Sequence, residues 1–278
     1  MTEKRTGVGG PHRLGRWFLL AVAGGLYLGT AVPAIADTSR YAVSAGVERF
    51  LWREYDTSGD KLLEEEGPRF FIGMDGERTM PSNWTYGFRA RAYSGEVDYD
   101  GQTQAGSTLE TDTDYEGIEL ALDFSHPLAA EGGSSPASLR FGLGVDWWDR
   151  TIEDTATASG YTERYRIPYL DFGLTYRWNE TVGFYAEGGV KHPFSTKESI
   201  DDLGNYDDVD LEPEGDFSPY LGIGYRFPAR WDIELSYETY RFDRSDDEPL
   251  KQNGVQVGTV TQPESKQDTI ALNVRYWF

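Results

Sequence analysis

Hydrophobic and polar residues alternate along the chain from about residue 44 onward, in segments of about ten residues. Successive side chains of a strand point to opposite faces, so a period of two indicates strands. The last segment shows this most clearly, with Ile270, Leu272, Val274, Tyr276 and Phe278 on one face. The pattern predicts ten strands, at about residues 44–55, 68–76, 84–95, 115–125, 138–149, 165–178, 182–192, 217–227, 231–242 and 267–278.

The connections between these segments alternate between long acidic stretches and shorter turns. Residues 193–216 form one of the long stretches, whereas Asn-Glu-Thr at 179–181 and Pro-Ala-Arg at 228–230 are tight turns. A soluble sandwich or a lipocalin-like barrel shows the same alternation, but has no reason to sort its loops by length. Barrels of the outer membrane have short periplasmic turns and longer extracellular loops. The sequence therefore predicts an all-β fold, a single up-and-down antiparallel transmembrane barrel of ten strands over residues 37–278, with eight or twelve strands as the alternatives.

The N-terminus has the layout of an export signal. Basic residues precede an apolar run at residues 17–32, and Pro33 follows it. Ala34 and Ala36 supply the small-residue pattern of a cleavage site, which predicts a cleaved signal peptide at residues 1–36. A retained anchor is the alternative, but the run of 16 residues is shorter than the roughly 20 that a spanning helix needs.

Charge and composition exclude several classes of protein. The formal net charge is −21, and cleavage after Ala36 leaves 22 Lys and Arg against 46 Asp and Glu, a net charge of −24. Such a charge argues against nucleic-acid binding. The absence of Cys excludes disulfides, and 14% aromatic residues argue against a disordered chain. No stretch after the signal could span a bilayer as a helix, so a membrane form must use strands.

If the apolar faces meet lipid, the alternate residues point into the barrel. The basic candidates are Arg49, Arg53, Arg69, Arg89, Arg91, Arg140, Arg177, Lys191, Arg226 and Arg275. The acidic candidates are Asp75, Glu119, Asp123, Asp146, Asp171, Glu187, Asp232, Glu234 and Glu238. Near-equal numbers in a narrow lumen predict a network of ion pairs, because an unpaired buried charge is costly. The excess of negative charge then belongs to the loops.

Neighbouring strands offer specific partners within this network. We expect Arg89 and Arg91 to pair with Glu119 and Asp123, and Arg226 and Arg275 to pair with Asp232, Glu234 and Glu238. Lumen glycines make room for the long side chains, namely Gly142, Gly144, Gly222 and Gly224. The phase of the first strand stays open, because Phe50 and Trp52 alternate with charged residues. A barrel of this size can be filled by side chains, so we expect a largely plugged lumen, with a narrow channel for small solutes as the alternative.

Catalytic and metal-binding patterns are weak. His192 has Ser195 three residues on, and His126 lies in a connection assigned to the periplasm, so solvated histidines are the better interpretation. The omptin proteases have Asp two residues before the histidine, where this chain has Val190, and lipid A deacylases have His-x-Ser. The segment at 56–67 departs from an EF-hand loop, with Lys61 sixth and Gly67 twelfth. We therefore expect no enzyme activity and no cofactor or defined metal site, and only weak attraction of divalent cations to loops such as 201–210.

The C-terminal Asn-Val-Arg-Tyr-Trp-Phe, with Tyr276 and Phe278 as its apolar positions, resembles the signal by which the barrel assembly machinery recognises its substrates. With the export signal and the strands, the chain resembles the outer-membrane β-barrel superfamily. Residues 50–73 are also similar to the opening hairpin of uncharacterised bacterial barrels. The resemblance implies a Gram-negative outer membrane, with its lipid and lipopolysaccharide as partners. Three functions remain open: a structural or surface-interaction barrel, which we favour, a narrow pore, and a surface hydrolase using His192.

Overall fold

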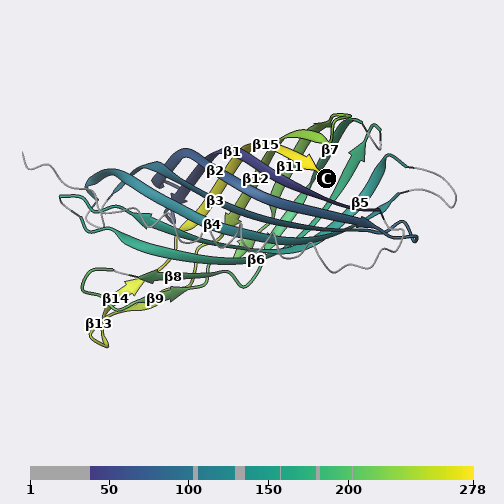
Figure 1. The fold of residues 1–278 in the computed structure, drawn as a ribbon. Coiled ribbons are helices and arrows are strands. Elements are labelled where there is room, and N and C mark those ends of the chain that lie inside the picture. The colour runs from purple at the N-terminus through teal and green to yellow at the C-terminus, as the bar shows by residue number, and fades with distance from the viewer. Residues whose placement is uncertain (1–37, 103–105, 129–134, 157, 180–181, 202) are drawn as a thin grey trace, which may run out of the picture. The chain divides into compact units, whose positions relative to one another are not determined.

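The computed structural model describes residues 38–278, apart from 103–105, 129–134, 157, 180–181 and 202. The signal peptide expected at residues 1–36, with Ala34 and Ala36, lies outside these residues. The described part is built from strands and turns (Figure 1). Within it, no helix is long and apolar enough to cross a membrane.

Ten long antiparallel strands form a closed barrel, as the alternation of the sequence predicted. Each strand pairs with the next one along the chain, β1 pairs with β15, and the pairing of β5 with β6 completes the ring. The barrel strands are β1 (Thr38–Tyr55), β2 (Lys61–Thr79), β3 (Thr85–Gln102), β4 (Thr108–Pro127), β5 (Ala137–Ile152), β6 (Tyr161–Arg177), β7 (Gly183–Pro193), β11 (Ser218–Arg226), β12 (Trp231–Phe242) and β15 (Glu264–Trp277).

The strands are longer at the long-loop end than the sequence predicted. Most of the stretch between residues 95 and 115, expected as an acidic loop, is strand, and β3 and β4 pair from Thr85 with Ser125 up to Gln102 with Thr108. The expectation of a loop there is wrong, because inward and outward residues still alternate, with charged residues in place of apolar ones on the outer face. Val97 and Tyr99 are buried, while Glu96, Asp98 and Asp100 beside them are charged and exposed.

A belt of apolar side chains covers the outside of the barrel. Its exposed members include Leu120, Leu122, Leu143, Phe172, Leu221 and Leu272. Exposed aromatic residues, among them Tyr86, Trp178, Trp231 and Phe278, lie near the short-turn end. Apolar side chains facing outward from a closed barrel are the reverse of a soluble barrel and match a barrel that meets lipid.

The first strand settles the phase that the sequence left open. Glu48, Phe50 and Trp52 are buried and face the lumen. Arg49 and Arg53 therefore point outward, where Arg49 pairs with Glu66 and Arg53 with Asp268. The interpretation of Arg49 and Arg53 as lumen residues is wrong, because large aromatic side chains fill this part of the lumen.

The connections after β7 and β12 carry five further strands: β8 (Lys197–Asp201), β9 (Val209–Leu211), β10 (Gly215–Asp216), β13 (Glu248–Gln252) and β14 (Val255–Val260). β8 continues the pairing with β6, and β9 pairs with β8 (Figure 1). The Asp207 carboxylate accepts backbone hydrogen bonds from Asn253 at 3.0 Å and Gly254 at 2.8 Å, at the tip of the β13–β14 hairpin. This contact joins the two long connections.

Candidate functional site in the barrel lumen

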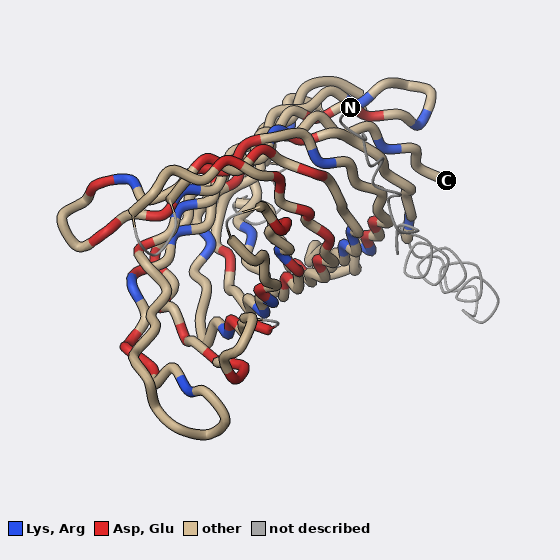
Figure 2. Tube along the Cα trace, turned by 90° about the vertical axis from the view of Figure 1, so that its left-hand side faces the viewer, with Lys and Arg blue, Asp and Glu red and all other residues tan. Residues whose placement is uncertain are grey.

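Charged side chains of both signs line the lumen at the level of the apolar belt, and both signs are found along the barrel strands (Figure 2). Glu119 on β4 is buried at the centre, with Arg91 Nε at 3.6 Å and Lys191 Nζ at 3.5 Å. Lys191 also reaches Glu238 at 2.6 Å. The strand register itself places Arg91 opposite Glu119, so alternation and pairing are sufficient to form this pair.

Arg140 on β5 forms a second centre. Its guanidinium lies 3.7 Å from Asp123, 3.8 Å from Asp171 and 3.4 Å from Glu187. These carboxylates come from β4, β6 and β7, so one cation contacts three strands. Truncating Arg140 would leave three carboxylates without this partner.

Arg275 on β15 forms the third centre, nearest the short-turn end. It contacts Asp232 at 2.7 Å and Glu234 at 2.6 Å, and Asp75 lies 4.0 Å away. The Tyr185 hydroxyl accepts a hydrogen bond from Arg275 at 2.6 Å and donates to Glu234 at 2.9 Å. This centre therefore contains the pairing that neighbouring strands suggested for Arg275.

Other candidates have different partners from those that the sequence suggested. Arg89 lies 4.0 Å from Glu238, across the lumen, and Asp146 accepts a hydrogen bond from Tyr93 at 2.8 Å. Arg177 and Arg226 face the lumen at its short-turn mouth, and neither has a carboxylate within ion-pair distance among the described residues.

Several lumen residues escaped the sequence analysis. Glu48 is buried and holds Arg69 at 2.5 Å and Arg91 at 3.7 Å, and it was missed because the phase of β1 was open. Buried tyrosines were missed because aromatic residues were assigned to the lipid face. The Tyr169 ring lies where a Cβ at Gly144 would stand, and its hydroxyl donates to Glu119 at 2.7 Å. The glycines do make room for long side chains.

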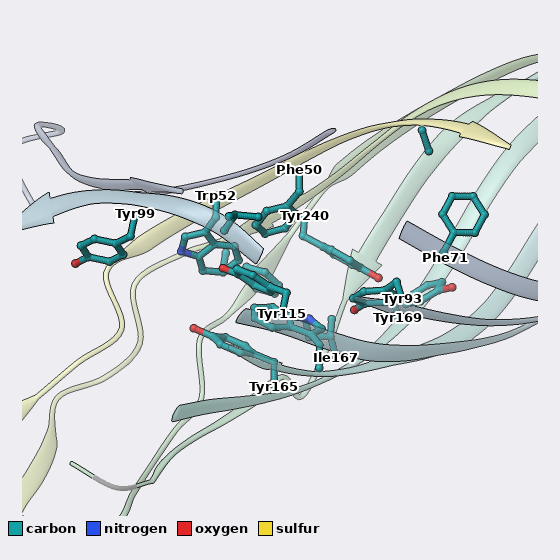
Figure 3. Close-up of a cluster of buried hydrophobic side chains, with 14 of the residues drawn as sticks. Phe50, Trp52, Phe71, Tyr93, Tyr99, Tyr115, Tyr165, Ile167, Tyr169 and Tyr240 are labelled. Atoms are coloured by element: carbon teal, nitrogen blue, oxygen red, sulfur yellow. The ribbon is translucent and has the colours of Figure 1, made fainter. Parts of the chain in front are cut away.

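Above the apolar belt, aromatic side chains fill the lumen (Figure 3). The Trp148 and Tyr165 rings stack at 4.0 Å, and Trp52 contacts both edge-on, at 5.6 and 5.8 Å. Phe50 and Tyr115 meet at 4.5 Å. We call this set, with Phe242, the aromatic layer. Each ring is at most 2% exposed, so the layer is packed as a protein core is.

One cation lies among several carboxylates beside the aromatic layer. Arg150 is fully buried and contacts Glu54 at 3.2 Å, Glu65 at 2.9 Å and Glu163 at 2.6 Å. Burial and the nearby Glu54 raise the pKa of Glu163 despite the opposing effect of Arg150. Burial, Glu163 and Glu54 raise the pKa of Glu198 well above its usual range. Both carboxyl oxygens of Glu198 are buried. This group has no clear signal in the sequence, because the strand ends that carry Arg150 and Glu163 are so rich in charge that they resemble loops.

A small cavity lies beside the charged centres. A cavity of about 20 Å³ lies among Asp75, Arg89, Arg91, Glu234 and Arg275. That volume is on the scale of a single water molecule.

The two histidines of the described residues, His126 and His192, lie on the outside of the barrel. The His192 ring packs against Phe217 at 5.2 Å, and the His126 ring packs against Trp84 at 5.0 Å. Among the described residues, no group of three or more His, Asp or Glu side chains is arranged to hold a metal ion.

No protein-family model matches the chain, and no curated protein matches its sequence. Its fold is similar to that of solved outer-membrane proteins. The outer membrane protease OmpT of Escherichia coli is 13% identical, with 89% of this chain and 100% of OmpT covered and a TM-score of 0.54. The translocator domain of the autotransporter NalP of Neisseria meningitidis is 13% identical, with 93% of each chain covered and a TM-score of 0.44. The likeness to OmpT shows a shared barrel fold.

Proposed function

We propose that this outer-membrane β-barrel protein has a closed lumen and acts through its extracellular surface. The observation that carries the proposal is the filling of the lumen at two levels. Three charged centres cross the lumen at the level of the lipid belt, with a cavity of about 20 Å³ beside the Arg275 centre, and the aromatic layer fills the lumen above them. A solute would have to separate buried ion pairs and displace packed rings, and both steps are costly.

The outer face of the extended strands supports a surface role. Above the apolar belt, the exposed faces of β2 to β5 carry Glu64, Glu66, Glu96, Asp98, Asp100, Glu110, Asp112, Asp114, Glu116 and Asp149. This level of an outer-membrane barrel lies beside the lipopolysaccharide headgroups. We propose that the face attracts divalent cations as a diffuse layer, through which it meets the phosphates of lipopolysaccharide.

Planar-bilayer recording of the purified protein tests the closed lumen. We expect no reproducible single-channel conductance. The matched control carries Trp52→Ala, Arg89→Ala and Arg91→Ala, which removes bulk from both levels, and we expect it to conduct. Both proteins must first show the heat-shifted gel migration of a folded barrel. Reproducible conductance by the unmodified protein would exclude the proposal in favour of the narrow pore.

We propose a role without catalysis. His192 is exposed beside Phe217, and Val190 stands where the omptin pattern has its aspartate. We expect the purified protein to hydrolyse neither peptide nor lipid substrates, and His192→Ala to leave any background rate unchanged. Hydrolysis by the unmodified protein that is lost in a folded His192→Ala protein would restore the hydrolase hypothesis.

A further inference from the structure

The short-turn mouth of the lumen differs from the three charged centres, because its arginines outnumber the available carboxylates. Arg40, Arg226 and Arg230 line a cavity of about 260 Å³ together with Phe227, Pro228, Trp277 and Phe278. We call this cavity the mouth pocket. In outer-membrane barrels the rim that carries the short turns and the chain ends faces the periplasm.

The side-chain carboxylates near the mouth pocket, Glu77 and Asp232, are already engaged. Glu77 pairs with Arg40. Asp232 stands opposite Arg226 in the strand register, but its Oδ1 accepts from Arg275 at 2.7 Å and its Oδ2 accepts from Trp277 at 2.7 Å. Among the described residues, no carboxylate lies within ion-pair distance of Arg226 or Arg230. The Nε of Arg226 is buried and has no hydrogen-bond partner in the part of the chain that the structure describes.

Contacts with Trp277 order the three arginines of the mouth pocket. Arg230 has a φ of 67°, in the left-handed region, and its carbonyl accepts a hydrogen bond from the Trp277 amide at 2.8 Å. The guanidinium groups of Arg40 and Arg226 lie 4.4 and 5.5 Å from the centre of the Trp277 ring. A left-handed non-glycine residue persists only where its surroundings fix it, so the turn is a built feature of the mouth.

We infer that the mouth pocket binds a phosphate group carried on an organic substituent. Guanidinium groups recognise phosphate oxygens through paired, charge-assisted hydrogen bonds, and Arg226 and Arg230 have donors to offer. The pocket is larger than phosphate alone requires, and Phe227 and Phe278 give it an apolar wall for the substituent. Because both Phe side chains are exposed at the lipid side of the rim, a phospholipid headgroup of the periplasmic leaflet fits the same chemistry as a free phosphate ester.

Binding is tested with the purified full-length barrel in a phosphorus-free glucoside detergent. One arm titrates inorganic phosphate, and the other titrates a short-chain phosphatidylglycerol below its micelle concentration. Calorimetry and ³¹P line broadening report saturation. If both probes saturate the protein at similar affinity, the phosphate group alone is sufficient for binding. If only the lipid saturates it, the pocket is a site for a phospholipid headgroup.

Two substitutions locate the site. Arg226→Gln and Arg230→Gln should each weaken binding about tenfold, which is the order expected when one hydrogen bond to a charged group is lost. Arg230 is exposed in a turn, so Arg230→Gln should fold even if Arg226→Gln does not. Arg166→Gln is the matched control, because Arg166 is an exposed arginine in the half of β6 nearer the long loops, away from the mouth pocket. The Arg166→Gln protein should bind the probes as tightly as the unmodified protein does. The inference fails if neither probe saturates, or if a folded Arg230→Gln protein binds as tightly as the Arg166→Gln control.

Discussion

The hairpin of β3 and β4 arranges its charges in opposite ways at two levels. In the lumen at the level of the belt, Arg91 stands directly opposite Glu119, and the two side chains pair. On the outer face above the belt, Glu96 stands opposite Asp114, Asp98 opposite Asp112, and Asp100 opposite Glu110. The same two strands thus contain complementary pairs and like-charge pairs.

The difference follows from solvent. A charge buried in the lumen, such as Glu119, has lost its water, and only an opposite charge or a hydrogen bond compensates for that loss. A carboxylate on the exposed face keeps its water, and salt screens its neighbours. Breaking a buried lumen pair should therefore lower the free energy of unfolding by several times the amount that removing a repulsion on the outer face raises it.

The largest effect is expected where one buried cation serves several carboxylates. Arg150→Met leaves Glu54, Glu65 and Glu163 buried without their common partner. We expect a loss of about 3–5 kcal/mol in the free energy of unfolding, as found when a buried ion pair is broken. Urea unfolding in lipid vesicles, followed by tryptophan fluorescence, measures it.

Arg164→Met is the control for Arg150→Met. Arg164 also contacts carboxylates, Asp149 and Asp201, but its side chain is 57% exposed. We expect a change of at most about 1 kcal/mol, the usual value of an exposed pair. Equal losses for the two substitutions would contradict the distinction between the lumen and the outer face.

A smaller loss is expected for Glu119→Gln. The substitution keeps the shape of the side chain and a partner for the Tyr169 hydroxyl, but it removes the charge that faces Arg91 and Lys191. We expect a loss of about 2 kcal/mol in the same unfolding measurement, because Glu238 and Glu48 still balance the two cations. A stability equal to that of the unmodified protein would show that the central pair is dispensable.

The outer face should respond with the opposite sign. Asp98 stands between Asp112 of β4 and Glu66 of β2. Asp98→Lys replaces two repulsions by attractions and should raise the free energy of unfolding by about 0.5–1 kcal/mol, the usual size of a cross-strand pair. Asp98→Asn removes the repulsion alone and should give a smaller gain. A loss of stability in both variants would mean that Asp98 has a favourable partner.

The sequence predicted the barrel, its strand order and most lumen charges, because alternation fixes which face of each strand a residue lies on. It failed where both faces of a strand mix apolar and charged residues. In β1, one face carries Glu48, Phe50 and Trp52 and the other carries Arg49, Leu51 and Arg53, so either face could have met lipid. Arg150 and Glu163 lie in strand ends so rich in charge that they resembled loops. Contacts across the lumen, such as Arg89 with Glu238, depend on the closed ring and leave no local signal.

The smallest expected effect is a dependence of stability on pH that originates on the outer face. Burial and the facing Asp149 raise the pKa of Glu116, and burial and Asp201 raise the pKa of Asp149 despite Arg164. Carboxyl groups with a raised folded-state pKa favour the folded state in their protonated form. This contribution is absent at pH 7, grows as the pH falls through the folded-state pKa values, and is complete below the ordinary values of 4.5 and 3.8.

Asp268 has the opposite effect on stability, because its ionised form favours the folded state, and it sets the lower limit of the pH range in which stability rises. Although burial opposes it, hydrogen bonds from Tyr237 and Arg241 hold the pKa of Asp268 below 3.8, so its contribution is lost at still lower pH. Stability should therefore rise slightly from pH 7 to about pH 4.5 and fall below about pH 3.8. Urea midpoints measured across this range should show a smaller rise in a Glu116→Gln, Asp149→Asn double variant, and the remainder belongs to Glu163 and Glu198, whose pKa values are also raised. If the double variant keeps the whole rise, the acid response comes from other carboxylates, and the like-charge pairs of the outer face cost the fold nothing measurable.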